Sequence, residues 1–148
     1  MRVRYSPLAD QFREVDGIFD DLRSLVRSGD FTLGRAVAQF EEAFAGQIGV
    51  KHAVGVGSGT DALKVPLKAI GIGPGHEVIT SANTFWATVG AIAEVGAKPV
   101  FVDCDDSFGM NLDLLEGAIT ANTKAIMPVH LTGSVIDMPR LNAIAATH

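Results

Sequence analysis

The chain has little of what marks several specialised classes of protein. Cys104 is the single cysteine among 148 residues, which excludes a disulfide framework and favours a reducing compartment. The 12 basic residues are outnumbered by 17 acidic ones and are scattered, which gives a net charge of −5 without a basic stripe. We therefore expect no nucleic-acid partner.

Long apolar runs are also missing. Glu94, Lys98 and Asp103 interrupt the most apolar stretches too soon for a membrane span. Early arginines open the chain, but no apolar run follows them, so we expect no signal peptide. Together these absences predict a cytoplasmic protein with no membrane partner, and we expect no metal site.

The first 50 residues have the pattern of amphipathic helices. Apolar residues recur every three or four positions, and Gly29 and Gly49 stand where two helices would end. The first apolar stripe consists of Leu8, Phe12, Val15, Phe19, Leu22 and Val26, and the second of Val37, Phe40, Phe44 and Ile48. We interpret both as packing faces of an N-terminal helical segment, residues 1–50.

Short β-branched runs then alternate with helical patterns over residues 51–148. We predict strands at 52–56, 77–80, 99–103 and 124–129, and helices at 60–70, 84–95, 111–119 and after Asp137. This alternation predicts an α/β fold, a mostly parallel sheet covered by helices. The sequence stops on a helix that should lead into another strand, which predicts an incomplete domain.

Residues 54–62, VGVGSGTDA, pass from a predicted strand through three glycines into a predicted helix. Such a turn presents unpaired backbone N–H groups and the positive end of the helix dipole, which together suit a phosphate. Ser58 and Thr60 add hydroxyl groups. A plain N-cap at Ser58 with a tight glycine turn is the alternative. A P-loop is excluded, because no lysine followed by serine or threonine occurs after the glycines.

Two phosphate ligands remain. Gly57, Gly59 and Ala62 fit a dinucleotide fingerprint, and Glu77 is the acidic residue at the right distance to bind the ribose. Ligands of such sheets lie at the carboxyl ends of the strands, however, and Glu77 begins its strand, which ends at Thr80 and Ser81. The other ligand is a monophosphate on a flat ring. Phe85 and Trp86 follow the second predicted strand, where an aromatic side chain could stack on such a ring rather than fill the core. The combination favours pyridoxal phosphate.

Three stretches then identify a family resemblance. They are SGDFTLGRAVAQFEEAFAGQIGVKHAVGVGSGTDAL, GIGPGHEVITSANTFWATVGAIAEVGAKPVFVDCD and TKAIMPVHLTGSVIDM. Together they resemble the DegT/DnrJ/EryC1/StrS aminotransferases, pyridoxal-phosphate enzymes of the aspartate-aminotransferase fold (fold type I) that act mainly on nucleotide-linked keto sugars. The resemblance covers nearly the whole chain but only the amino-terminal portion of a typical member. It makes residues 51–148 the first part of the cofactor-binding large domain.

The resemblance assigns cofactor contacts by position. The phosphate cradle falls on the backbone N–H groups of Gly59, Thr60 and Asp61 and on the Thr60 hydroxyl, with Ser58 beside them as a further cofactor contact. The ring-stacking aromatic falls on Phe85, and Trp86 is its neighbour. His130 and Asp103 follow two strands at the same edge and are candidates for contact with substrate. Their ordinary alternatives are a histidine satisfied by loop carbonyls and an aspartate that caps the next loop.

The departures from the family concern the reacting groups. The family's Schiff-base lysine and the aspartate that pairs with the pyridine nitrogen lie beyond this chain, so we assign no catalytic residue. The five lysines, Lys51, Lys64, Lys68, Lys98 and Lys124, are expected to be solvated surface residues. Pro66 lies inside the helix predicted at 60–70, where the lost hydrogen bond can cost about 3 kcal/mol, so we expect a kinked or shortened helix.

The resemblance implies transfer of an amino group from glutamate or glutamine to a nucleotide-linked keto sugar, by a homodimer. The 148-residue chain alone is expected to be inactive. A dehydratase that uses the same scaffold is a related alternative. A truncated module that binds phosphate or assists a partner's folding, and a nicotinamide-dependent oxidoreductase fragment, are the alternatives from other classes.

Overall fold

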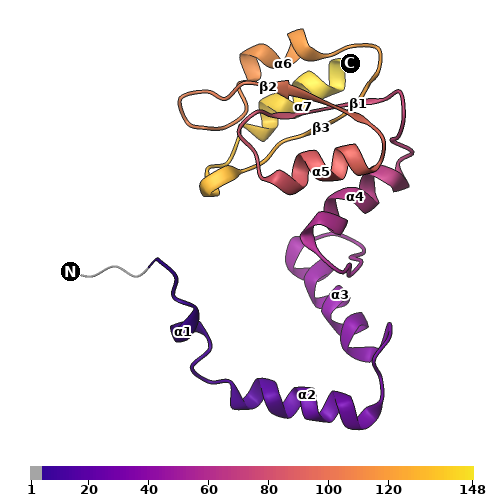
Figure 1. Cartoon of the computed structure of the whole chain (residues 1–148), viewed down its shortest axis with the longest axis vertical. Helices are drawn as coiled ribbons and strands as arrows, with labels where there is room; N and C mark the ends of the chain where they lie inside the picture. Colours follow the sequence, from indigo (N-terminus) through magenta and orange to yellow (C-terminus); the bar gives the residue numbers. More distant parts are fainter. Residues whose placement is uncertain (1–4) are drawn as a thin grey trace, which may run out of the picture. The chain divides into compact units, whose positions relative to one another are not determined.

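The computed structural model describes residues 5–148, which form two compact units divided between Gly55 and Val56 (Figure 1). Residues 1–4 of the predicted N-terminal segment lie outside the described residues. The first unit contains three helices, α1 (Leu8–Gln11), α2 (Asp16–Ser28) and α3 (Arg35–Ile48). The first predicted stripe is therefore split, because residues 12–15 between α1 and α2 are not helical.

Glycines end the two longer helices, as predicted. Gly29 and Gly49 adopt left-handed backbone conformations, with φ of 70° and 76°, and their N–H groups bond back to carbonyls of the preceding turn. The apolar stripes of these helices are largely open to solvent: Phe19, Leu22, Val26, Phe40 and Phe44 are each at least 49% exposed. Within this unit they lack the cover that a packing face requires.

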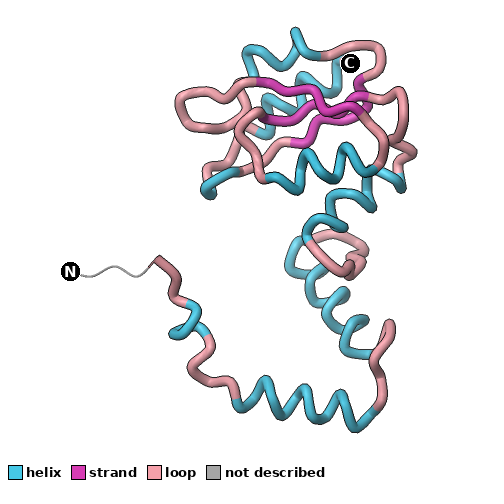
Figure 2. Tube along the Cα trace, in the orientation of Figure 1, coloured by secondary structure: helices cyan, strands magenta, loops and turns pink. Residues whose placement is uncertain are grey.

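The second unit contains a parallel sheet, which confirms the predicted α/β class. Its strands are β1 (Glu77–Ser81), β2 (Lys98–Val102) and β3 (Thr123–Met127), in the order β2-β1-β3 (Figure 2). The central strand β1 is buried along its whole length. The strands end on one edge of the sheet, where the loop after β2 and the short helix η1 (Leu131–Gly133) also lie (Figure 1).

The predicted strand at 52–56 is wrong. This segment has no regular structure, and Val54 is 78% exposed. Glu41 of α3 accepts a 2.6 Å hydrogen bond from the Gly55 N–H. A strand needs a neighbour to satisfy its backbone groups, and residues 5–148 supply none for this run.

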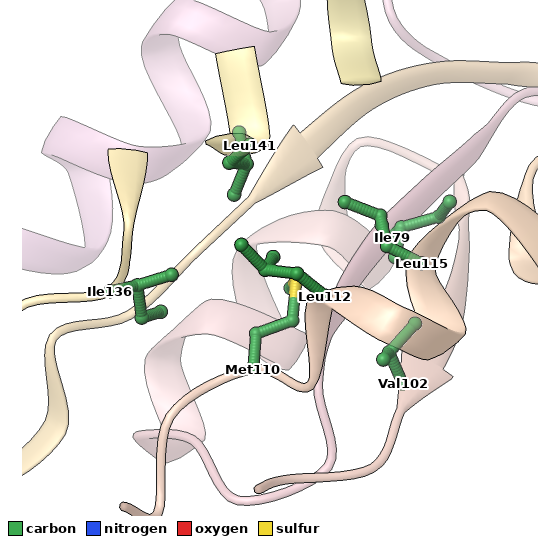
Figure 3. Close-up of a cluster of buried hydrophobic side chains, with 7 residues drawn as sticks. All are labelled: Ile79, Val102, Met110, Leu112, Leu115, Ile136 and Leu141. Atoms are coloured by element: carbon green, nitrogen blue, oxygen red, sulfur yellow. The ribbon is translucent and has the colours of Figure 1, made fainter. Parts of the chain in front are cut away.

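Helices cover both faces of the sheet and produce two apolar clusters. On one face α4 (Gly59–Ala69) and α5 (Trp86–Glu94) meet β1 and β2 around Leu67, Ile72, Val78, Ile92, Val95 and Ala97. On the other face α6 (Leu112–Ala118) and α7 (Met138–Thr147) enclose the cluster drawn in Figure 3: Ile79, Val102, Met110, Leu112, Leu115, Ile136 and Leu141. The alternating side chains of β1 therefore serve both clusters.

Helix α4 includes Pro66 and continues to Ala69, so the expected shortening does not occur. The Ile70 N–H still bonds to the Pro66 carbonyl at 3.0 Å. Leu67, one residue further on, is 3% exposed and belongs to the first cluster. Tertiary packing thus outweighs the local cost of the proline. No helix in the described part of the chain is long and apolar enough to cross a bilayer.

Acid is expected to weaken this unit through Glu77. Its carboxylate pairs with Lys98 at 2.9 Å and accepts a 2.6 Å hydrogen bond from the Thr120 hydroxyl, and these contacts, Lys98 first, lower the Glu77 pKa below its ordinary 4.5. A carboxylate whose pKa is lower in the folded than in the unfolded protein stabilises the fold at pH values above its unfolded-state pKa. This stabilisation is lost as the pH falls through the pKa of the folded state.

We therefore expect Glu77→Gln to lower the urea midpoint at pH 7, and the difference from the unaltered protein to shrink below about pH 4.5. Urea denaturation from pH 7 to pH 3 measures this, with Glu42→Gln on an exposed part of α3 as the control. A difference that stays constant with pH would contradict the assignment.

Candidate functional site

The start of α4 presents free backbone donors. Ser58 is extended, with φ −160° and ψ 164°, and its hydroxyl oxygen accepts a hydrogen bond from the Asp61 N–H at 3.1 Å. Among residues 5–148, no acceptor pairs with the N–H groups of Gly59 and Thr60. A Cβ atom placed on Gly59 would meet nothing within 4 Å, so the space beside its Cα is open. Both interpretations of Ser58, the N-cap and the anion site, are compatible with this geometry.

Asp61 and Lys64 form a charged network beside these donors. The Asp61 carboxylate accepts a 2.9 Å hydrogen bond from the Ser58 hydroxyl and pairs with the Lys64 ammonium at 2.8 Å. Lys64 also pairs with Glu94 of α5 at 3.0 Å. The Asp61 pKa is lowered, chiefly by the hydrogen bond from Lys64 and to a smaller extent by the one from Ser58. The Lys64 pKa is raised, chiefly by its hydrogen bond to Asp61 and to a smaller extent by the one to Glu94.

Lys64 therefore differs from the expectation of a solvated lysine. Its side chain is 24% exposed, against 71% for Lys98. The spacing of three residues between Asp61 and Lys64 was a usable signal for their pairing. The partner on α5 was not visible in the sequence, because Glu94 lies thirty positions away and reaches Lys64 only through helix packing.

The two aromatic side chains at the start of α5 are open to solvent. Phe85 takes the N-cap position in an extended conformation and is 65% exposed, and Trp86 is 80% exposed. The buried face of the helix carries Ala87, Thr88, Ala91 and Ile92 instead. Neither ring fills the core of this unit, so both are free to stack on a ligand.

Asp103 and His130 follow β2 and β3 at the edge where these strands end. Asp103 caps its own loop, since its carboxylate accepts a 2.8 Å hydrogen bond from the Cys104 N–H. The His130 ring accepts a 3.3 Å hydrogen bond at Nδ1 from the Ile136 N–H. The loop backbone therefore satisfies the His130 Nδ1 atom, as the ordinary alternative proposed. The partner is a backbone N–H group, however, and not the expected carbonyl.

The structure brings together only part of the predicted set. Parallel topology places the start of α5, Asp103 and His130 at the same sheet edge. The contacts that hold α4 do not involve this edge of the sheet. The Lys64–Glu94 ion pair attaches α4 to the end of α5, and Leu67 attaches it to the buried cluster. No hydrogen bond or ion pair within residues 5–148 joins residues 58–61 to Phe85 or Trp86.

Ser81 was named in the sequence only as a residue that closes its strand, not as a candidate for binding. Its hydroxyl is fully buried and has no hydrogen-bond partner in the described part of the chain. The neighbouring Thr80 hydroxyl instead donates to the Met127 carbonyl at 2.9 Å and so ties β1 to β3. Glu77 does open β1, which supports the geometric argument against a ribose-binding acid at this position.

Solved structures similar to this chain include aminotransferases, and its fold is part of a fold-type I transferase. The Streptomyces venezuelae protein DesV, solved with a ketimine intermediate, matches with a TM-score of 0.93 at 38% identity, over 99% of this chain and 40% of its own. A putative sugar aminotransferase of Streptococcus pneumoniae in its PLP form matches with a TM-score of 0.82 at 39% identity, over 85% of this chain and 32% of its own.

The chain belongs to the DegT/DnrJ/EryC1/StrS aminotransferase family, whose model matches residues 13–148. A curated relative, the dTDP-3-amino-3,4,6-trideoxy-alpha-D-glucose transaminase of Micromonospora megalomicea, is 44% identical over 142 residues. That alignment covers 95% of this chain and 38% of the relative. The chain thus spans about two fifths of the length of such relatives.

Proposed function

We propose that this chain is the part of a nucleotide-sugar aminotransferase that anchors pyridoxal phosphate. The single observation that carries the proposal is that the N–H groups of Gly59 and Thr60, at the start of an eleven-residue helix, have no acceptor among residues 5–148. These donors fit a phosphate dianion in number and in charge. Of the amides that the resemblance assigns to the cradle, the third, Asp61, is already bonded to Ser58.

Each residue of the proposed site has a limited task. Gly59 and Thr60 hold the phosphate, and the Thr60 hydroxyl adds a further donor. Phe85 lies against one face of the ring, and Trp86 borders it. When bound, the cofactor supplies the electron sink for amino transfer. Phosphate anchoring stabilises ground and transition states equally, so these residues determine affinity and orientation rather than the rate of the chemical step.

The complete enzyme would move an amino group from glutamate or glutamine to a nucleotide-linked keto sugar, or dehydrate such a sugar in the related variant. A second copy of the protein is part of the proposal, and the exposed apolar stripes of α2 and α3 support it. Asp103 and His130 lie at the strand ends where a substrate would approach. Their existing loop hydrogen bonds leave other atoms of each side chain for that contact.

Fluorescence and NMR titrations of the 148-residue chain test the anchoring role. Trp86 is the single tryptophan, so we expect pyridoxal phosphate to quench its emission saturably while inorganic phosphate leaves it unchanged. Both ligands should shift the amide signals of Gly59 and Thr60. Failure of both ligands to shift these amides would overturn the proposal. A saturable response to NADH alone would favour the oxidoreductase alternative instead.

A further inference from the structure

The start of α4 combines anion donors with an acidic side chain. The carboxylate of Asp61 lies in the same first turn as the free amides of Gly59 and Thr60. Its Oδ2 atom would be 3.4 Å from a Cβ atom on Gly57, so the carboxylate borders the glycine turn itself. A negative group in this position repels a phosphate unless its charge is compensated.

Lys64 supplies that compensation. Its ammonium lies 2.8 Å from Asp61 Oδ1, while Asp61 Oδ2 is occupied by the Ser58 hydroxyl at 2.9 Å. Both carboxylate oxygens are therefore engaged. Glu94 on α5, 3.0 Å from the ammonium, holds Lys64 from the other side, so the cation is fixed between two helices rather than free to swing into solvent.

We propose that Lys64 is a positioning residue that makes the start of α4 receptive to a phosphate dianion by compensating the charge of Asp61. The inference rests on the proposed function, because it assumes that a phosphate group binds there. The Lys64 ammonium is paired with the carboxylates of Asp61 and Glu94, so its effect on the phosphate passes through Asp61. The raised pKa of Lys64 and the lowered pKa of Asp61 agree with a stable charged pair.

The competing explanation is an ordinary helix pair. Exposed ion pairs three residues apart contribute little to stability and have no consequence for a ligand. The two explanations differ in one respect: only a compensating lysine should become dispensable when Asp61 is made neutral. A double-mutant cycle between positions 61 and 64 therefore separates them.

The experiment is a titration of inorganic phosphate into the 148-residue chain, followed through the amide signals of Gly59 and Thr60. We expect Lys64→Met to weaken phosphate binding about five- to tenfold at low salt, and less in high salt. Lys64→Arg should retain most of the affinity. Lys68→Met is the matched control: Lys68 is exposed and lies one turn further along α4, so its loss removes the same charge at a greater distance from the site. We expect this variant to change phosphate affinity less than about twofold.

The double variant Asp61→Asn with Lys64→Met decides the mechanism. We expect it to recover the affinity of Asp61→Asn alone to within about twofold. If it binds as weakly as Lys64→Met, Lys64 does not act through Asp61 and the inference is overturned. Equal affinities for Lys64→Met and Lys68→Met would also overturn it. If the unaltered chain shows no phosphate response at these amides, the proposed function fails first, which keeps the two failures distinguishable.

A stability measurement keeps this test free of folding effects. Glu94→Gln removes one contact between α4 and α5, the Lys64–Glu94 ion pair, but leaves the Asp61–Lys64 pair and the buried Leu67 in place. We expect it to lower the melting temperature without weakening phosphate binding. A loss of phosphate affinity in Glu94→Gln as large as in Lys64→Met would show that helix docking, not charge compensation, controls the cradle, and would contradict the inference.

Discussion

Gly59→Pro is expected to weaken phosphate binding tenfold or more while leaving α4 folded. Gly59 is the first residue of α4, the position where proline is best tolerated because its missing N–H has no helical acceptor. Ser58 before it is extended, as a residue preceding proline must be. The substitution thus removes one of the two unpaired donors and little else. A charge-assisted hydrogen bond contributes about 1.5–3 kcal/mol, and its loss corresponds to a decrease in phosphate affinity of about tenfold or more.

Gly59→Ala is the matched control. It keeps the N–H group, and its methyl group would meet nothing within 4 Å, so phosphate affinity should be unchanged. The same amide titration measures both variants, with Thr60 as the reporter in Gly59→Pro, and circular dichroism verifies that the helix content is retained. Equal phosphate affinities for the proline and alanine variants would mean that the Gly59 amide does not bind the anion, which removes the central support of the proposed function.

The largest effect on stability is expected from Ile79→Ala. Ile79 is fully buried on the central strand and packs in the cluster with Val102, Leu115 and Leu141 (Figure 3). Truncation removes three carbon atoms from a site that strands on either side prevent from collapsing. We expect a loss of about 3–4 kcal/mol in the free energy of unfolding.

Urea denaturation with a common slope for all variants measures this loss. Ile70→Ala is the matched control, because Ile70 at the end of α4 is 67% exposed and should lose less than about 0.5 kcal/mol. Similar losses for the two variants would mean that β1 is not the centre of a packed unit in solution. The site would then lack the rigid support that the proposed function needs, since β1 leads directly to the loop that carries Phe85.

Features set by neighbouring residues were predictable from the sequence. Ser58 is the N-cap of α4, which was the alternative that the glycine turn left open, and Asn111 and Asp137, at the predicted starts of two further helices, cap α6 and α7. The three strands from residue 77 onward were predicted within two residues of their observed ends. For Phe85 and Trp86 the sequence left two interpretations open, stacking on a ligand ring or filling the core, and their exposed fractions of 65% and 80% favour the first.

Features that depend on distant residues were not predictable in the same way. The run at 52–56 has the composition of a strand, but a strand exists only with a partner, and no other described segment pairs with it. Pro66 predicted a kinked or shortened helix; the shortening does not occur, because the burial of Leu67 against β1 and α5 keeps α4 helical to Ala69. The apolar periodicity of the first stripe continued across residues 12–15, where the backbone leaves the helix.

The sequence by itself determined the helix caps, the helix-ending glycines, the α/β alternation and the free amides at Gly59 and Thr60. These follow from the steric and hydrogen-bonding preferences of residues within one or two turns of each other. Only the tertiary structure decided that Lys64 lies between Asp61 and Glu94 and that the Ile136 N–H donates to the His130 ring. It also decided that the Ser81 hydroxyl is buried without a partner among residues 5–148. The physical reason is that such contacts arise when separate elements pack, and packing is fixed by the combined shape of many side chains rather than by any local pattern.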